Sequence, residues 1–221
     1  MKLLMIFAAL LLAQAALAEE KNEIQFLLGA VKPTNNVSIQ GSDSLGTSGL
    51  AVGGRYLRET TVTGLQVGGE IMSLNPGSAA SDTLITNTNS TVQVKSLAFM
   101  ADAKLAKTDG TVRPWVLVGL GFHSTNMDIE SAPKAGFVWT DTGTRETRTV
   151  VDSTKTGVAA TLQGGLDFPV NDQFLIGAGI AWYALGSTTY DATPAARQFG
   201  LTGISGGISD VAFLVSANYR F

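Results

Sequence analysis

The chain has 221 residues, of which 45% are hydrophobic and 15% charged, and it contains 25 glycines and no cysteine. A formal net charge of −3 gives no support to nucleic-acid binding. Without cysteine the chain has neither a disulfide framework nor an acylated lipoprotein terminus, and a lone histidine makes a zinc site a poor expectation.

The first 18 residues have the pattern of a secretory signal peptide. Lys2 precedes an apolar run over Leu3–Leu12, and Ala16–Ala18 fits a small-x-small cleavage site. This run is shorter than the ~20 residues of a membrane-spanning helix, so an uncleaved anchor is the weaker alternative. We therefore expect residues 1–18 to be removed and residues 19–221 to form one domain. Cleavage takes away only Lys2 among the charged residues, which leaves 14 basic and 18 acidic side chains.

The remaining chain predicts strands rather than helices. It is rich in glycine, shows no helical periodicity and has no later run of 18 or more apolar residues. Side-chain character alternates with a period of two in eight segments, which are separated by turn residues such as Pro33 and Asp109-Gly110. The predicted strands are Glu23–Val31, Gly49–Arg58, Gly64–Ser73, Val92–Ala106, Thr111–Ser124, Gly157–Phe168, Gln173–Leu185 and Val211–Phe221.

The connections between these strands alternate between long and short. An even number of strands with short turns at one end and long loops at the other is typical of bacterial outer-membrane barrels. We therefore predict an all-β fold, an eight-stranded antiparallel up-and-down transmembrane β-barrel. The four long connections run approximately over Thr34–Ser48, Asn75–Thr91, Ser131–Thr156 and Thr188–Ser209.

One face of each predicted strand is apolar and the other collects charge. A soluble lipocalin-like barrel, the alternative, would place its apolar side chains inside and its charges outside. Charge facing lipid is costly, at about 2–4 kcal/mol for Arg or Lys at the midplane. We therefore expect the charged face to line the lumen as a paired network, with Arg55–Glu70 and Asp102–Arg113 as the first pairs. The predicted network consists of Arg55, Glu70, Asp102, Lys104, Arg113, Asp167 and Arg220.

Two segments carry a resemblance to a known family. The closing segment Val211–Phe221 alternates strictly and ends on Tyr219-Arg220-Phe221. Residues 113–122 read Arg-Pro-Trp-Val-Leu-Val-Gly-Leu-Gly-Phe. Together with the strand pattern, these segments resemble the small eight-stranded outer-membrane barrels, the opacity-protein and outer-membrane-protein-A-type domain family, over nearly the whole mature chain.

This resemblance implies a location and a set of partners. It implies a multi-pass protein of the Gram-negative outer membrane, in contact with lipid and lipopolysaccharide and inserted by the barrel-assembly machinery. A terminal phenylalanine such as Phe221 serves as an assembly signal in this family. We expect no cofactor and no nucleic-acid partner. The sequence leaves the oligomeric state open, with a monomer as the default.

Two features suggest chemistry or recognition. His123-Ser124-Thr125-Asn126 is similar to the His-x-Ser-Asn motif of outer-membrane lipid-A deacylases, but it has Thr125 where that motif has serine, and neighbours in a strand point to opposite faces. In the third long connection, Trp139, Arg145 and Arg148 could contact lipopolysaccharide phosphates or a partner surface. We expect this connection to continue as a strand pair, Phe137–Thr140 with Thr147–Val151.

Three functions remain open at this point. The first is a structural or surface-interaction barrel whose loops form the working surface, with no enzymatic activity. The second is a narrow channel or carrier for small solutes, since an eight-stranded barrel is just wide enough for side chains to fill. The third, a remote alternative, is a lipid-A-modifying enzyme.

Overall fold

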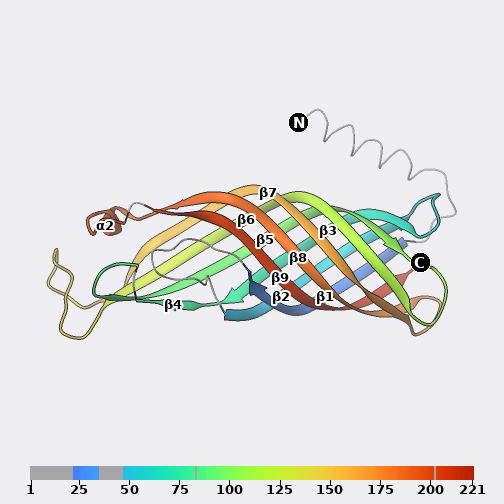
Figure 1. Ribbon diagram of the computed structural model, residues 1–221, viewed down its shortest axis with the longest axis horizontal. Helices are drawn as coiled ribbons and strands as arrows, with labels where there is room; N and C mark the ends of the chain where they lie inside the picture. The colour runs from blue at the N-terminus through green and yellow to red at the C-terminus, as the bar shows by residue number, and fades with distance from the viewer. Residues whose placement is uncertain (1–21, 35–46, 83, 202) are drawn as a thin grey trace, which may run out of the picture.

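A computed structural model of the protein describes residues 22–34, 47–82, 84–201 and 203–221. Within these residues the chain forms a single antiparallel sheet and one short helix (Figure 1). The predicted signal peptide and most of the first long connection lie outside the described residues. Cleavage after Ala18 therefore stays a prediction.

Eight long strands close into a ring. β1 pairs with β9, and β3 pairs with β5, so the sheet has no open edge among its long strands. The short strand β4 pairs with residues 90–92, near the beginning of β5. The strands are β1 Asn22–Pro33, β2 Thr47–Glu59, β3 Leu65–Gly77, β4 Ala79–Ser81, β5 Thr88–Ala106, β6 Arg113–Pro133, β7 Arg148–Pro169, β8 Phe174–Asp191 and β9 Gly203–Arg220, and the helix is α2 Pro194–Arg197.

The two ends of the barrel differ in the length of their connections. One end, which we call the turn end, holds Asn22, Phe221 and the short turns 60–64, 107–112 and 170–173. Asn22 and Phe221 exchange two backbone hydrogen bonds there, of 2.9 and 3.0 Å. The opposite end, the loop end, holds α2 and the connection 134–147 (Figure 1). The alternation of connection lengths in the sequence is thus confirmed.

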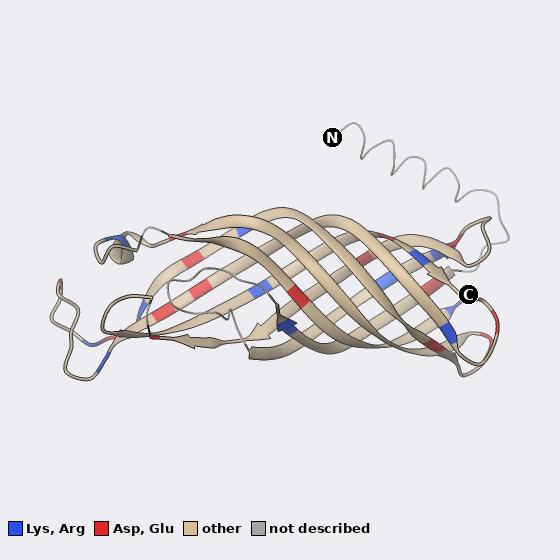
Figure 2. Ribbon diagram, in the orientation of Figure 1, with Lys and Arg blue, Asp and Glu red and all other residues tan. Residues whose placement is uncertain are grey.

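The outward face of the wall is apolar. Leu120, Val158 and Phe213 are 60–66% exposed although they lie in regular strands. Charged positions occur along the wall as well as at its ends (Figure 2). Among the strand residues, Arg55, Glu70, Asp102 and Lys104 are buried. This partition is the one predicted for a membrane barrel and the opposite of that in a lipocalin.

Several strands are longer than the sequence predicts. β6 runs to Pro133 and β7 begins at Arg148, so most of the predicted third connection is a paired hairpin. Inward residues such as Met127 and Ile129 stay apolar there, while the outward Asn126 and Asp128 are polar. Outward residues that do not face lipid need not be apolar. A prediction based on apolar outward faces therefore ends these strands too early.

The second and fourth connections are shortened in the same way. β3 extends to Gly77 and β5 begins at Thr88, with β4 between them, and β8 and β9 reach Asp191 and Gly203. The expected strand Phe137–Thr140 is not formed. These residues belong to a tight turn in which the Trp139 amide donates to Thr144 O at 2.8 Å.

The lumen has two zones. The half nearer the turn end contains most of the charged and amide side chains, and the half nearer the loop end contains an apolar cluster that the sequence prediction of a polar interior did not include. One carboxylate, Asp210 of β9, is buried between Ile208 and Ala212 of this cluster. Leu84, from the connection before β5, and Ala196, from α2, are buried in this cluster and close it at the loop end. The lumen-facing part of the cluster includes Leu27, Val31, Met72, Leu74, Val92, Val94, Met127, Ile129, Leu185, Ile204 and Leu214.

Candidate functional site

The first layer of the lumen network is centred on Arg55, which β2 directs inward. Its guanidinium forms an ion pair with Glu70 of β3, and its Nε lies 3.2 Å from Asp102 Oδ2. Tyr183 donates its hydroxyl to Glu70 Oε1 at 2.9 Å, and Gln163 donates to Glu70 Oε2 at 3.2 Å. All five side chains are buried, so the barrel is crossed from wall to wall at this level.

The second layer lies nearer the turn end and is centred on Lys104. Its Nζ is 2.8 Å from Asp167 Oδ2 and 3.4 Å from Glu23 Oε1. Glu23 also accepts from Arg220 Nε at 2.6 Å, and Trp115 donates to Asp167 Oδ1 at 3.1 Å. These contacts join residues of β1, β5, β6, β7 and β9.

Gln25 connects the two layers, because it donates to Glu23 and accepts from Arg55 Nη1 at 2.8 Å. One network therefore extends from Arg220 at the turn end to Tyr183. It holds three basic side chains, Arg55, Lys104 and Arg220, against four carboxylates, Glu23, Glu70, Asp102 and Asp167.

The expected pair Asp102–Arg113 is wrong. Asp102 lies opposite Gly119 in the β5–β6 ladder, whereas Arg113 lies opposite Asp167 at the start of β6. Arg113 is therefore beyond the end of the network, and its Nε donates to Gly110 O at 3.4 Å. The two strands are neighbours, as expected, but the register of the hairpin separates these side chains along its length.

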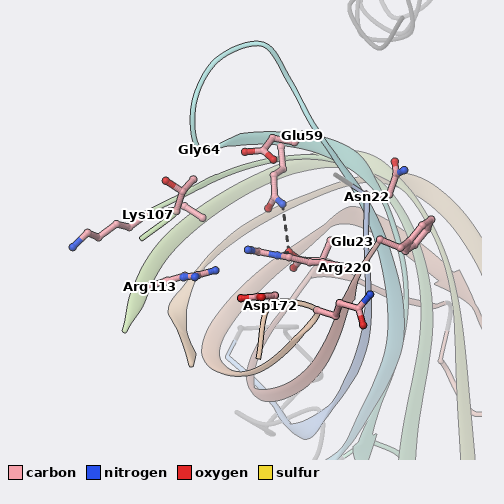
Figure 3. A pocket seen from close by; sticks show the side chains of 13 residues that line it. Asn22, Glu23, Glu59, Gly64, Lys107, Arg113, Asp172 and Arg220 are labelled. Atoms are coloured by element: carbon pink, nitrogen blue, oxygen red, sulfur yellow. Dashed lines mark hydrogen bonds and ion pairs between the residues drawn. The ribbon is translucent and has the colours of Figure 1, made fainter. Parts of the chain in front are cut away.

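A cavity of about 500 Å³ lies at the turn end, directly below the network. Figure 3 shows Arg113 and Arg220 reaching into it from opposite sides, with Asp172 and Glu59 also on its wall, and Arg220 is joined to Glu23. Charges of both signs are mixed on this wall, so the cavity favours no single class of ligand. It brings solvent to the second layer of the network.

Sequence reasoning missed the neutral members of the network. Gln25, Gln163 and Tyr183 complete the hydrogen bonds of the charged side chains, and all are buried. Each of these residues is polar and lies at an inward position of a predicted strand, which is the signal that could have identified it. The predicted network contained only charged side chains and therefore left them out.

His123 faces the lumen above the network. Its Nδ1 lies 2.8 Å from Thr125 Oγ1, which in turn lies 2.9 Å from Ser96 Oγ. Ser124 is on the opposite face of the strand and Glu130 is exposed outside the wall. The motif residues therefore do not assemble into a His/Ser/Glu site.

The connection 134–147 folds around Trp139 and Arg148 instead of presenting them. Trp139 is 2% exposed, its Nε1 donates to Glu146 O at 2.7 Å, and its ring lies 5.0 Å from that of Phe199. The Arg148 guanidinium lies 5.0 Å above the Trp139 ring and binds both oxygens of Asp141 at 2.8–2.9 Å. The prediction that Trp139 and Arg148 form an external contact surface is thus wrong, since both are used inside the loop.

Arg145 remains as the exposed cation of this connection. No described residue places a carboxylate against it. Phe137 and Val138 of the same connection are also exposed, at 45% and 49%. The loop is also joined to its neighbours. Lys134 N donates to Asn87 O at 2.8 Å, and Thr193 N, before α2, donates to Val150 O at 2.9 Å.

Across residues 22–34, 47–82, 84–201 and 203–221, no three His, Cys, Asp or Glu side chains gather in a way that could hold a metal ion. In the same residues no helix has the length and apolar character needed to cross a membrane.

Comparison with known proteins gives a family and a fold. A family model described as the outer membrane protein beta-barrel domain matches residues 3–221. The crystal structure of Neisserial surface protein A is similar with a TM-score of 0.55 at 12% identity, covering 90% of this chain and 97% of that one. OprG from Pseudomonas aeruginosa has a TM-score of 0.47 at 14% identity, covering 91% of this chain and 95% of that one. Ail of Yersinia pestis has a TM-score of 0.44 at 14% identity, covering 93% of this chain and 100% of that one. No curated protein sequence matches the chain closely enough to count as a relative.

Proposed function

Because the chain belongs to the outer-membrane β-barrel family, we propose that it is a non-conducting barrel that acts at the cell surface through its loop end. In bacterial barrels the short turns face the periplasm and the long loops face outward. The loop end is then the external surface, and the turn end with both termini is periplasmic.

The filled lumen is the observation that supports this proposal most. Ion-paired side chains cross the barrel in two layers, and the apolar cluster occupies the half above them. An aqueous path would have to break buried ion pairs and hydrate an apolar core, both of which are costly. A barrel of this kind holds its loops in place more readily than it passes solutes.

The loop end supports a role in recognition. The contact of Trp139 with Phe199 ties two of its connections together, and an ion pair of 2.7 Å joins Lys155 of β7 to Asp191 of β8. Rigid presentation of a surface lowers the entropy lost on binding. We infer that the barrel is a monomer inserted by the assembly machinery, because its closed ring offers no strand edge to a second copy.

We also infer that the protein is not a lipid-A-modifying enzyme. His123 points into the lumen, the Thr125 hydroxyl beside it is fully buried, and Ser124 points outward, so this base has no accessible nucleophile next to it in the described part of the barrel. Mass spectra of lipid A from cells with and without the protein test this point, and a new deacylated species that disappears with His123→Ala would contradict it.

Two measurements test the surface function. In planar bilayers the wild-type barrel should give no stable single-channel steps. Cells carrying it should attach to a target surface, such as a eukaryotic cell monolayer, more strongly than cells whose residues 135–146 are replaced by a short Gly/Ser linker. Val170→Ser, at a periplasmic turn, is the control. If the wild-type barrel conducts steadily and cells with the loop replacement attach as strongly as cells with the wild type, the proposal is wrong.

A second candidate is a narrow gated channel, and the composition of the network favours it. The network has one carboxylate more than its basic side chains, so a path opened through it would select cations. Conductance that appears in Glu70→Ala but not in the wild type would identify the network as a gate.

A further inference from the structure

The connection 134–147 carries an exposed patch, formed by Phe137, Val138 and Arg145, that the fold of the loop leaves outside. The Trp139 amide donates to Thr144 O at 2.8 Å, which brings the two legs of the turn together. Val138 and Arg145, the residues just outside this bond, therefore lie on facing legs. The patch thus combines two exposed apolar side chains with one cation on a single turn.

Both carboxylates of the connection 134–147 contact a cation within the loop, whereas the cation of the patch has no carboxylate partner in the described part of the chain. Asp141 and Glu146 are bound by Arg148 at 2.8 and 3.0 Å, and Asp191 is bound by Lys155 at 2.7 Å. The two carboxylates of the connection itself are thus bound by Arg148, whereas Arg145 has no such partner among the described residues. The charge that the loop offers to a partner is positive.

The shape of the patch favours a lipid surface over a protein as its partner. The loop projects beyond the strand ends (Figure 1) as a convex tip. A stable protein–protein interface buries about 800 Å² on each partner, which two half-exposed side chains on one turn do not supply. A lipid surface accepts a convex tip, with apolar side chains inserted at shallow depth and a cation at the level of the headgroups.

We propose that Phe137, Val138 and Arg145 form a docking tip for the anionic surface of an apposed membrane. This inference rests on the proposed surface function and names its target. Each contact is weak, and the many copies of a barrel in one outer membrane make the attachment multivalent. Trp139 fills the inside of the loop, where the Arg148 guanidinium lies 5.0 Å above its ring, and Phe137 and Val138 remain outside.

The test uses the full barrel in phosphatidylcholine nanodiscs and fluorescent vesicles, either of pure phosphatidylcholine or with one third phosphatidylserine. The barrel should bind the anionic vesicles and lose this binding at high salt, because exposed charges are screened. Arg145→Glu should weaken the binding about tenfold, and Phe137→Ser with Val138→Ser should abolish it. Equal binding to both kinds of vesicle, or binding that ignores these variants, would overturn the proposal.

Matched controls lie at the opposite end of the barrel. Lys107→Glu reverses one exposed charge and Val62→Ser removes one exposed apolar side chain, and neither should change vesicle binding. Folding of every variant is checked by the heat-dependent shift of the barrel on gels. A loss of binding in the controls equal to that in the tip variants would show that the effect is not specific to the tip.

The attachment assay separates this proposal from the surface function. If cells attach through residues 135–146 but vesicles do not bind, the membrane target is wrong and the surface function stands. Attachment that disappears when the target cells are treated with protease would identify a protein partner and also reject the membrane target. If neither vesicles nor cells respond to the loop, both proposals fail.

Discussion

At the scale of single residues, the lumen depends on one cation that serves two acids. Arg55 contacts both Glu70 and Asp102, and all three side chains are at most 1% exposed. Removal of either acid leaves the arginine with the other, whereas removal of the arginine leaves two carboxylates together in a low dielectric. The consequences of substitution should therefore be unequal.

We predict that Arg55→Leu lowers the free energy of unfolding by about 3–5 kcal/mol, as expected for a buried charge left without its partner. Glu70→Gln should cost less, because Asp102 still neutralises Arg55. The urea midpoint of the barrel refolded in lipid vesicles measures both. The double change Arg55→Leu with Glu70→Leu should recover part of the loss, and equal midpoints for wild type and Arg55→Leu would show that the pair is hydrated.

A second residue-scale prediction concerns Gly119. A Cβ at this position would lie 2.3 Å from Asp102 Oδ1 and 2.7 Å from Thr161 Cγ2, so the wall beside the network has room only for glycine. Gly119→Ala should destabilise the barrel by about 1–3 kcal/mol through overpacking. Gly54→Ala is the control, since the nearest atom to its Cβ would be Gln25 O at 3.8 Å. Equal urea midpoints for the two variants would contradict the crowding.

At the scale of elements, the long β6–β7 hairpin carries a loop with its own small core. Hydrogen bonds from the Arg148 guanidinium hold the pKa of Asp141 below its ordinary range. A carboxyl with a lowered pKa in the folded state stabilises that state above its ordinary pKa and loses this contribution as the pH falls through the lowered value. The loop should therefore keep its fold at neutral pH and loosen in acid.

We predict that Arg148→Gln loosens the loop at neutral pH, whereas the wild-type loop loosens only below about pH 4. The emission of Trp139, obtained as the difference between each protein and its Trp139→Phe counterpart, should shift towards that of an exposed indole. Arg145→Gln is the control, because Arg145 has no carboxylate partner in the described loop. A Trp139 signal that is the same with and without Arg148 would contradict this account.

At the scale of the whole molecule, the chain ends where the ring closes. β9 completes the barrel against β1, and Phe221 exchanges backbone hydrogen bonds with Asn22 while its side chain stays 53% exposed. Its ring stacks on Tyr219 with 5.9 Å between centroids. The last residue therefore contributes to closure through its backbone, while its side chain stays exposed on the outer surface.

We predict that deletion of Phe221 lowers the yield of heat-modifiable barrel in the outer membrane several-fold. Phe221→Ala should lower it less, because its backbone bonds to Asn22 remain. Pulse-labelled cells followed over time measure the rate of assembly, and Phe174→Ala, another exposed aromatic at the turn end, is the control. Wild-type kinetics in the deletion variant would count against a role for the terminal residue.

The sequence by itself determined the strand count, the order of long and short connections and the face that each side chain takes. These features depend on a period of two and on local turn chemistry, both of which can be read along the chain. It also placed Arg55 and Glu70 on the inward faces of neighbouring strands. It underestimated β6 and β7, because outward residues beyond the lipid are polar and hide the alternation.

Only the tertiary structure decided which inward groups meet. Asp102 of β5 binds Arg55 of β2, two strands away, rather than Arg113 in the adjacent strand β6, and Trp139 turns into its loop to meet Phe199, which is 60 residues away in the chain. Such contacts depend on hairpin register and on ring closure, which bring distant strands within reach of one another. A one-dimensional pattern specifies the face of a residue but not the partner it meets there.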